Sequence, residues 1–325
     1  MRTLLTGGTG FIGSHLAEHI PGDIVCLVRK TSNTTRLKKL GVEIVYGDLT
    51  DCKSLQNAAK DVDVVYHLGA YYTFHGVWEK YYTVNVEGTK NLITACENVD
   101  QFIYCSSTEA VGPVNTIPAD ETHSLHPVYD YGKSKVMAET IVNQKIAHGY
   151  PATIIRPVGV YGPRCIDDVS YYFLMNIAKN SIFTRFIVGS GENVIDFVFV
   201  KDLVQGFLKA RNKKAIGETY FISSPCALSY NEVYTTVCRL VGRTPPSIHI
   251  PAVAAKLMIA PLQGAYKIIG KKDFMAHIST VDDTQSNRAY SWEKAHKDFN
   301  YQPEYIFEKG ARITLEWYKK HGYIT

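Results

Sequence analysis

The N-terminal half of the chain alternates short apolar runs with stretches in which apolar residues recur at helical spacing. The apolar runs predict strands, at residues 2–6, 23–28, 42–46, 62–67, 101–105 and 152–156. The stretches between them predict helices, at residues 11–20, 34–40, 52–59, 80–97 and 131–148. Because the runs lack apolar–polar alternation, we expect strands buried on both faces. This rhythm predicts an α/β fold with a doubly wound parallel sheet.

The pattern changes after residue 157, where Gly and Pro cluster in the segment 157–163. Further on, the stretch 181–200 predicts strands, and helical patterns lie at 201–212, 229–241, 252–269 and 304–321. We therefore expect a nucleotide-binding domain over residues 1–160, with later returns near 190–212. Residues 161–325 are expected to form mainly a smaller, substrate-binding domain.

The segment 251–270 is largely apolar, but Lys256, Pro261 and Lys267 interrupt it. It falls short of the roughly 20 uninterrupted apolar residues that a membrane-spanning helix needs. We expect a packed helix or a lid here, with a helix lying on a membrane surface as the alternative.

Composition narrows the class of protein further. The chain has 325 residues, of which 46% are hydrophobic and 20% charged, which excludes a disordered protein. A net charge of +4 gives no reason to expect nucleic-acid binding. The seven cysteines form no CxxC pair, so we expect no metal site and no disulfide framework, but buried thiols in a reduced compartment. The first residues enter an apolar strand directly, so we expect no secretory leader and a cytoplasmic protein.

A glycine-rich segment, TGGTGFIG, lies between the first strand and the first helix. Gly7 suits a tight turn, Gly10 lets the backbone approach a pyrophosphate, and Gly13 permits close packing of helix on strand. Phe11 and Ile12 open the helix, whose N-terminal N–H groups favour phosphate. This motif requires a strand before it and a helix after it, and both are predicted here. The segment predicts a Rossmann-type dinucleotide site.

The end of the second strand bears on the choice of cofactor. Sites that prefer NAD place a carboxylate there for the ribose 2′-hydroxyl, whereas this chain has Arg29 and Lys30 and no acid in the run 27–32. These cations would bind a 2′-phosphate. We therefore expect NADP to be preferred, with NAD still possible. The alternative is that both are solvated loop charges.

Tyr131 and Lys135 form a YxxxK unit, whose spacing places both residues on one helix face. A tyrosine with an ordinary pKa of about 10 is a poor acid–base group at neutral pH, and a nearby ammonium would lower that pKa. Ser106, Ser107 and Thr108 follow the fifth strand, at the sheet edge where open α/β folds bind ligands. Taken singly, each hydroxyl has the alternative of a turn or helix cap.

Together these segments resemble the extended short-chain dehydrogenase/reductase family, also called the NAD-dependent epimerase/dehydratase family. The resemblance rests on TGGTGFIG (6–13), GDLTD (47–51), HLGA (67–70), NVEGT (85–89), CSSTEAVG (105–112), YGKSK (131–135), RPVGVYGP (156–163) and DFVFVKDLV (196–204). It implies that Tyr131 is the general acid or base, that Lys135 holds the nicotinamide ribose, and that Ser107 orients the substrate oxygen.

The resemblance also implies further cofactor contacts. Asp48 and Leu49 match the pair that contacts adenine, Gly69 and Ala70 line the cofactor, and Pro157 and Val158 lie at its nicotinamide end. Asn85 packs near the site, or only satisfies backbone groups. Members often dimerise through the helices that correspond to 80–97 and 131–148, so we expect a homodimer.

Two departures from the family pattern concern the substrate. Nucleotide-sugar enzymes usually have Asn where this chain has Gly159, and Arg where it has Ile195 before Asp196. Arg164 or Arg185 remain alternative partners for a diphosphate. The aromatic segment YYTFHGVW (71–78) suits an apolar pocket or ordinary core.

The chain looks most like the branch that contains 3β-hydroxysteroid dehydrogenases, sterol-4-carboxylate dehydrogenases and dihydroflavonol 4-reductases. We expect an oxidoreductase that transfers a hydride between NADP and a secondary alcohol or ketone of a cyclic, largely apolar substrate. The alternatives are a sugar or nucleotide-sugar epimerase or dehydratase that recycles its cofactor, and a non-enzymatic dinucleotide sensor.

Overall fold

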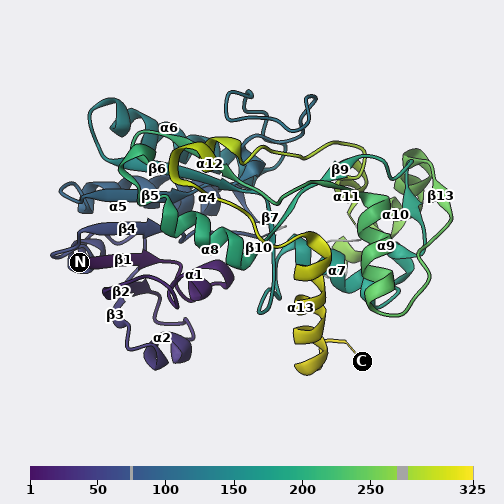
Figure 1. Ribbon diagram of the computed structural model, residues 1–325, viewed down its shortest axis with the longest axis horizontal. Coiled ribbons are helices and arrows are strands. Elements are labelled where there is room, and N and C mark those ends of the chain that lie inside the picture. The colour runs from purple at the N-terminus through teal and green to yellow at the C-terminus, as the bar shows by residue number, and fades with distance from the viewer. Residues whose placement is uncertain (74–75, 269–276, 325) are drawn as a thin grey trace.

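A seven-stranded sheet forms one end of the molecule in the computed structural model, which describes residues 1–73, 76–268 and 277–324 (Figure 1). All neighbouring strands run parallel, in the order β11-β6-β5-β4-β1-β2-β3. The strands are β1 (Arg2–Thr6), β2 (Asp23–Val28), β3 (Glu43–Tyr46), β4 (Val64–His67), β5 (Gln101–Cys105), β6 (Ala152–Pro157) and β11 (Thr219–Ile222). The predicted doubly wound parallel sheet is confirmed.

Helices cover both faces of this sheet, as parallel strands require. One face packs against α1 (Phe11–Leu16), α2 (Thr35–Lys39), α8 (Val200–Lys209) and α12 (Glu293–Phe299). The other face packs against α3 (Cys52–Ala58), α5 (Gly88–Ala95) and α6 (Asp130–Ala147). Fully buried Leu16 and Phe207 fill the first layer, and Leu55 and Leu92 fill the second. Burial of such a side chain stabilises the fold by about 2 kcal/mol.

Strand β11 joins the sheet beyond the expected returns near 190–212. Its four residues pair with β6, and α12 packs against it. A four-residue edge strand carries too little periodicity to be recognised in a sequence. The helix α12 that covers it was not expected either.

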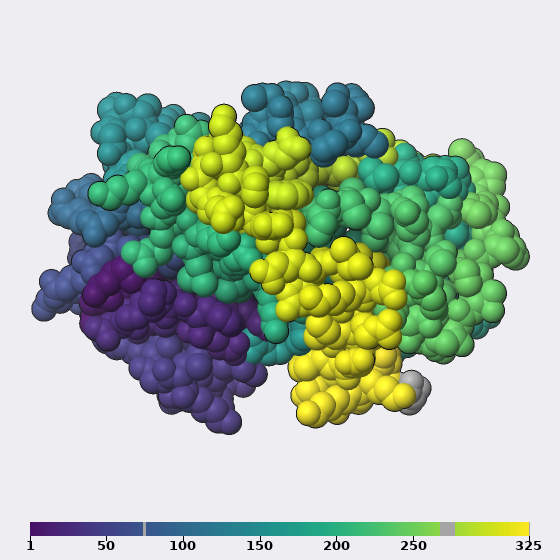
Figure 2. All heavy atoms as spheres, in the orientation of Figure 1, coloured from purple at the N-terminus to yellow at the C-terminus, as the bar shows by residue number. Residues whose placement is uncertain are grey.

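The other end of the molecule is mostly helical (Figure 1). It contains α7 (Val169–Ala178), α9 (Tyr230–Leu240), α10 (Ala252–Ile268), α11 (Ile278–Asp283) and α13 (Phe307–Lys320). In Figure 2 the yellow C-terminal residues cover the junction between the purple N-terminal residues and the green helical end. Helix α13 belongs to the apolar cluster of this end, where fully buried Tyr318 and Val233 lie.

The strands predicted over 181–200 are reduced to two- and three-residue pieces. The pieces are β8 (Ile187–Val188), β9 (Val194–Ile195) and β10 (Phe197–Phe199), which pair with β13 (His249–Ile250), β12 (Leu228–Ser229) and β7 (Gly159–Tyr161). The segment begins instead with a 3₁₀ turn, Ile182–Thr184. Gly189 and Gly191 take positive φ angles of +72° and +73°, which end β8 and separate it from β9.

The helix predicted over 80–97 is not a single α-helix. It consists of α4 (Trp78–Tyr81), a π-helical stretch from Tyr82 to Glu87, and α5. π-Helical turns are uncommon and often lie at functional sites. This one contains Asn85, one of the residues that the family resemblance places near the active site.

The segment 251–270 forms α10 over its described part and packs through Ala255 and Ile259 against Val281 of α11. The expected packed helix is therefore present, although Val253 and Leu257 are about 70% exposed on its outer side. Within the described part of the chain, no helix is both long and apolar enough to cross a membrane.

The cysteines are unpaired, as expected, but not all are buried. Cys52 and Cys226 are exposed, which corrects the expectation that the thiols act as small core hydrophobes. Cys52 begins α3 and Cys226 follows β11, where the chain faces solvent. The other five are buried.

Candidate active site

The predicted cofactor residues gather at one edge of the sheet because each follows the carboxyl end of a parallel strand. This edge is where ligands of open α/β sheets bind. The residues are Gly7, Gly10, Phe11, Ile12 and Gly13 after β1, Arg29 and Lys30 after β2, Asp48 and Leu49 after β3, Gly69 and Ala70 after β4, and Pro157 and Val158 at the end of β6.

The glycine-rich turn has the close backbone packing that a dinucleotide cradle needs. Gly7 has a φ of +74°, and a methyl group there would lie 2.7 Å from the backbone carbon of Leu68. A methyl group on Gly13 would lie 2.2 Å from the carbonyl oxygen of Gly7. Neither position accepts a side chain, so α1 starts directly against the turn. The residues present therefore fit a dinucleotide cofactor.

The residues expected at the adenosine end lie in loops that follow β2 and β3. The side chains of Arg29 and Lys30 are exposed. The Asp48 carboxylate accepts hydrogen bonds from the backbone N–H of Thr50 at 3.0 Å and from its hydroxyl at 2.9 Å. Leu49 is 8% exposed and fills the space beside Gly88.

Tyr131 and Lys135 lie together on the first turns of α6. The Nζ atom of Lys135 is 5.7 Å from the centroid of the Tyr131 ring and donates a hydrogen bond to the Cys105 carbonyl oxygen at 2.7 Å. This contact ties α6 to the end of β5. The predicted spacing on one helix face thus brings the phenol and the ammonium close to each other.

Ser107 lies two residues after β5, on a turn that packs against α6. Its hydroxyl oxygen accepts a hydrogen bond from the Glu109 N–H at 3.1 Å, so the hydroxyl keeps its own proton to donate. The turn approaches α6 closely because Gly132 has no side chain. A methyl group at Gly132 would lie 2.2 Å from the Glu109 carbonyl oxygen.

The pKa of Tyr131 differs from the sequence expectation. Burial raises it well above its usual range, and the Cys105 thiol and the carboxylates of Asp168 and Glu109 add to the effect. The expected lowering by Lys135 is therefore not found. Burial also lowers the pKa of Lys135, whose ammonium is bound to a carbonyl oxygen. The phenol is accordingly held in its protonated, donating form.

Aromatic rings surround the Tyr131 side chain. The Tyr72 ring lies edge-on at 4.9 Å between centroids, and the Tyr81 ring lies at 6.4 Å. Tyr71 packs in turn against Tyr81 at 5.0 Å. The segment 71–78 therefore reaches the predicted catalytic residues, although Phe74 and His75 lie outside the described residues.

Asn85 holds this aromatic segment against α6. Its side-chain oxygen accepts from the Tyr71 N–H at 2.7 Å, and its amide group donates to the Tyr71 carbonyl oxygen at 3.0 Å. The same amide donates to the Ser134 hydroxyl at 2.9 Å. Asn85 satisfies backbone groups, as one interpretation had it, and those groups belong to the active-site segment.

An ion-pair cluster next to Ser107 was not anticipated. Arg288, 8% exposed, contacts Glu109 at 2.9 Å and Asp283 at 3.1 Å. Asp283 also accepts a hydrogen bond from the Tyr129 hydroxyl at 2.8 Å. The cluster joins the turn after β5 to the C-terminal end of α11. An acid two residues after Ser107 was visible in the sequence, but its partner lies 179 positions away.

Asp168 is a second residue that sequence reasoning missed. It precedes α7 and accepts from the Ser170 N–H at 3.2 Å, so it caps that helix. Burial raises the pKa of its carboxyl to about 6. Its charge in turn helps to raise the pKa values of Tyr72 and Tyr131. An acidic residue before an apolar run indicates a helix cap, but the sequence does not show that it lies near the phenol of Tyr131.

A buried ion pair supports the other side of α6. Arg156 binds both carboxylate oxygens of Glu139, at 2.9 and 2.6 Å, and Ser106 donates to the same carboxylate at 2.5 Å. Ser106 therefore has a structural role. Within the described ranges, no three His, Cys, Asp or Glu side chains are placed to hold a metal ion.

Comparison with known proteins agrees with this geometry. A model of the NAD dependent epimerase/dehydratase family matches residues 3–223, so the chain belongs to this family. It is thus an NAD-dependent enzyme of the extended short-chain dehydrogenase/reductase type.

The relatives include both steroid and sugar enzymes. A 3-beta-hydroxysteroid dehydrogenase of Mycolicibacterium neoaurum is 28% identical over 98% of this chain and 91% of its own. A putative UDP-glucose 4-epimerase of Methanocaldococcus jannaschii is 31% identical over 74% of this chain and 82% of its own. The crystal structure of gox2253 superposes with a TM-score of 0.83 at 27% identity and covers 99% of both chains.

Proposed function

We propose that this enzyme is an NADP-preferring oxidoreductase that acts on a secondary alcohol or ketone of a cyclic, largely apolar substrate. The observation that carries the proposal is the surroundings of Tyr131. Its phenol lies beside Lys135 and among the rings of Tyr72 and Tyr81. A proton donor enclosed by aromatic rings suits a substrate whose reacting oxygen projects from an apolar ring system.

The proposed mechanism uses three side chains. The bound nicotinamide would supply or accept the hydride. In the reductive direction Tyr131, kept protonated by burial, donates its proton to the substrate oxygen. Ser107 donates a second hydrogen bond to that oxygen, and the positive charge of Lys135 favours the phenolate left on Tyr131. In the oxidative direction Tyr131 has to lose its proton first, which requires a higher pH.

Four features of the chain disfavour a nucleotide-sugar substrate. An Asn side chain at position 159 would collide with the Phe197 ring, because a β-carbon there already lies 2.9 Å from it. Ile195 stands before Asp196, where nucleotide-sugar enzymes usually have the Arg that pairs with the diphosphate. Arg164, an alternative diphosphate partner, contacts Glu18 at 2.6 Å. The carboxylate of Asp168, whose charge helps to raise the pKa of Tyr131, would also repel a diphosphate.

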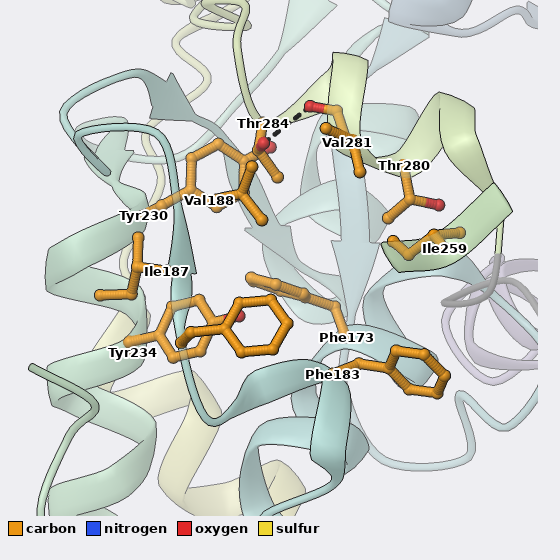
Figure 3. Close-up of a pocket in the computed structure, with 11 residues that line it drawn as sticks. Phe173, Phe183, Ile187, Val188, Tyr230, Tyr234, Ile259, Thr280, Val281 and Thr284 are labelled. Carbon is orange, nitrogen blue, oxygen red and sulfur yellow. Dashed lines mark hydrogen bonds between the residues drawn. The ribbon is translucent and has the colours of Figure 1, made fainter. Parts of the chain in front are cut away.

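An apolar cavity of about 40 Å³ lies beyond this site (Figure 3). Phe173, Tyr230 and Tyr234 line it from α7 and α9, and Val281 closes it from α11. The hydroxyl oxygen of Tyr129, two residues before Tyr131, lies 3.4 Å from the carbonyl oxygen of Ser279 in α11. The interior of the helical end is apolar at this cavity, which supports an apolar substrate.

The preference for NADP rests on the end of β2. Arg29 and Lys30 are exposed there, where an NAD-preferring site would have a carboxylate. Two cations would bind the 2′-phosphate by charge-assisted hydrogen bonds.

We further propose a homodimer that pairs the segment 80–97, which includes the π-helical stretch and α5, and the helix α6 with their copies. A groove of about 790 Å³ runs between the π-helical stretch and α6, lined by Val86, Met137 and Ile141 among others. Met137 is 38% exposed on α6 and would be covered by the partner copy. Light scattering of the purified protein tests the proposal, and a monomer at micromolar concentration contradicts it.

A screen of cyclic ketones and alcohols with NADPH, NADP, NADH and NAD tests the proposed function. We expect oxidation or reduction of the added cofactor in proportion to product. Turnover of a nucleotide sugar without added cofactor would instead support an epimerase. A steroid and a flavonoid ketone are suitable first substrates, with UDP-glucose as the comparison.

A further inference from the structure

His67 is buried at the end of β4 between two threonine hydroxyls. Its Nδ1 atom is 2.7 Å from the hydroxyl oxygen of Thr6, and its Nε2 atom is 3.0 Å from that of Thr89. The ring is 1% exposed, and burial, with the nearby charge of Lys135, lowers its pKa to about 3. The imidazole is therefore neutral and carries a single N–H.

The surrounding contacts determine which nitrogen carries the proton. Thr89 donates its only hydroxyl proton to the Asn85 carbonyl oxygen at 2.6 Å, so its oxygen must accept from Nε2–H of His67. Nδ1 is then an acceptor, and Thr6 donates to it. The Thr6 oxygen in turn accepts from the Gly69 N–H at 2.9 Å. All donors thus point in one direction, from Gly69 through Thr6, His67 and Thr89 to Asn85.

The two ends of this chain of hydrogen bonds lie in different parts of the site. Thr6 and Gly69 belong to the predicted cofactor cradle, where Gly7 packs against the backbone of Gly69. Asn85 brackets the Tyr71 backbone and donates to Ser134, whose hydroxyl donates to the Tyr131 carbonyl oxygen at 2.7 Å. The series of hydrogen bonds from Gly69 to Asn85 is continuous, and the side chains that form it, those of Thr6, His67 and Thr89, are buried.

We propose that His67 is a positioning residue, which couples the geometry of the cofactor cradle to Tyr131 and to the aromatic segment through Thr89 and Asn85. The proposal rests on the proposed function, since it assigns Tyr131 the reacting proton. A neutral imidazole suits this place because it donates on one side and accepts on the other. It therefore fixes Thr6 as its donor and Thr89 as its acceptor.

The first test removes one hydroxyl. Thr89→Val keeps the size of the side chain but breaks the contacts to His67 and Asn85. We expect kcat to fall about 10-fold, because small displacements of a proton donor are costly, while the cofactor Kd changes less than about 2-fold. Thr89→Ser restores the hydroxyl and is expected to regain most of kcat.

Thr3→Val is the matched control. Thr3 lies in β1 like Thr6 and is fully buried, and its hydroxyl has no hydrogen-bond partner among the described residues. If Thr3→Val lowers kcat as much as Thr89→Val, or if Thr89→Val leaves kcat unchanged, the proposal is overturned. If Thr89 had only a structural role, Thr89→Val would lower Tm but would not lower kcat while leaving the cofactor Kd unchanged. Thr89→Ser would then not restore kcat.

The second test needs neither substrate nor a foldable Thr89 variant. With ¹⁵N-labelled histidine, the His67 signal is identified by its loss in His67→Gln. We expect the Nε2–H tautomer, with no titration between about pH 5 and 9. An Nδ1–H tautomer, or titration near the ordinary histidine pKa of about 6.5, would refute the proposed polarity. Failure here is distinct from failure of the proposed function, because the unliganded protein is measured.

Discussion

The sheet end and the helical end of this molecule build their parts of the site in different ways. At the sheet end, residues of short continuous motifs, such as Gly7 to Gly13 and Tyr131 to Lys135, meet because parallel strands terminate at one edge. At the helical end, Arg288 reaches Glu109 across 179 positions. The first arrangement is local in sequence and the second is not.

Because of this difference, the residues expected to carry the reaction and those expected to select the substrate lie in different parts of the molecule. The groups that would hold the cofactor and move the proton lie on backbone turns and on one helix face. Few neighbouring residues can change the positions of these groups. Groups that would surround the substrate, including Asp168 and Asp283, come from loops and helix ends of the other part. Changes at the sheet end should therefore affect catalysis, and changes at the helical end should affect stability, charge and selectivity.

The largest expected effect is at Tyr131. Tyr131→Phe removes the proton donor, so we expect kcat to fall about 1,000-fold with little change in cofactor Kd. Steady-state rates and fluorescence titration with NADPH measure the two quantities. Tyr66→Phe serves as the control, because the buried Tyr66 hydroxyl has no hydrogen-bond partner in the part of the chain that the structure describes. Full activity of Tyr131→Phe would remove the basis of the proposed mechanism.

The next effect tests the helical end. Arg288→Gln leaves Glu109 and Asp283 without their cation, which is expected to destabilise the fold by about 3 kcal/mol. The exposed pair Arg239–Glu308 is the comparison, and Arg239→Gln should cost about 0.5 kcal/mol. Urea unfolding at neutral pH measures both. Equal losses would show that the buried cluster does not hold the two parts together.

Cofactor choice is expected to shift by a smaller amount. Arg29→Asp replaces a cation with a carboxylate that repels the 2′-phosphate, so the ratio of KM for NADPH to KM for NADH should rise about 10-fold. Lys39→Asp, an exposed change in α2, controls for net charge. An unchanged ratio would make Arg29 a solvated loop charge.

The smallest predicted effect concerns pH. The Asp168 carboxylate raises the pKa of Tyr131, so Asp168→Asn should lower that pKa. The oxidative rate, which rises as Tyr131 loses its proton, should then rise at a pH about 0.5 unit lower. A pH profile of kcat measures the shift, with Asp167→Asn, an exposed neighbour, as the control. A shift to higher pH would contradict the placement of Asp168.

Much of the sheet end was predictable from the sequence, for physical reasons that particular residues illustrate. Buried parallel strands require continuous apolar runs, and β4 and β5 have them. Gly7 and Gly13 have no space for side chains, so their spacing is imposed by the turn itself. The four-residue separation of Tyr131 and Lys135 is a property of a helix face.

The helical end was not predictable to the same degree. Strands expected over 181–200 shrank to short pieces because Gly189 and Gly191 turn the chain, and α7, α11 and α12 were not anticipated. The π-helical stretch around Asn85 was likewise hidden in an apparently regular helical pattern. Short elements of this kind are stabilised by contacts distant in sequence, which periodicity does not record.

The sequence alone determined the fold class and the dinucleotide motif, because both depend on local spacing, and its resemblance to a known family indicated the residues expected to carry the reaction. Only the tertiary structure decided the electrostatic environment of these residues. Burial and the carboxylates of Asp168 and Glu109 raise the pKa of Tyr131, opposite to the effect that the Tyr–Lys spacing suggested. Spacing places an ammonium near a phenol, but desolvation and charge are sums over all neighbours, which only the folded chain brings together.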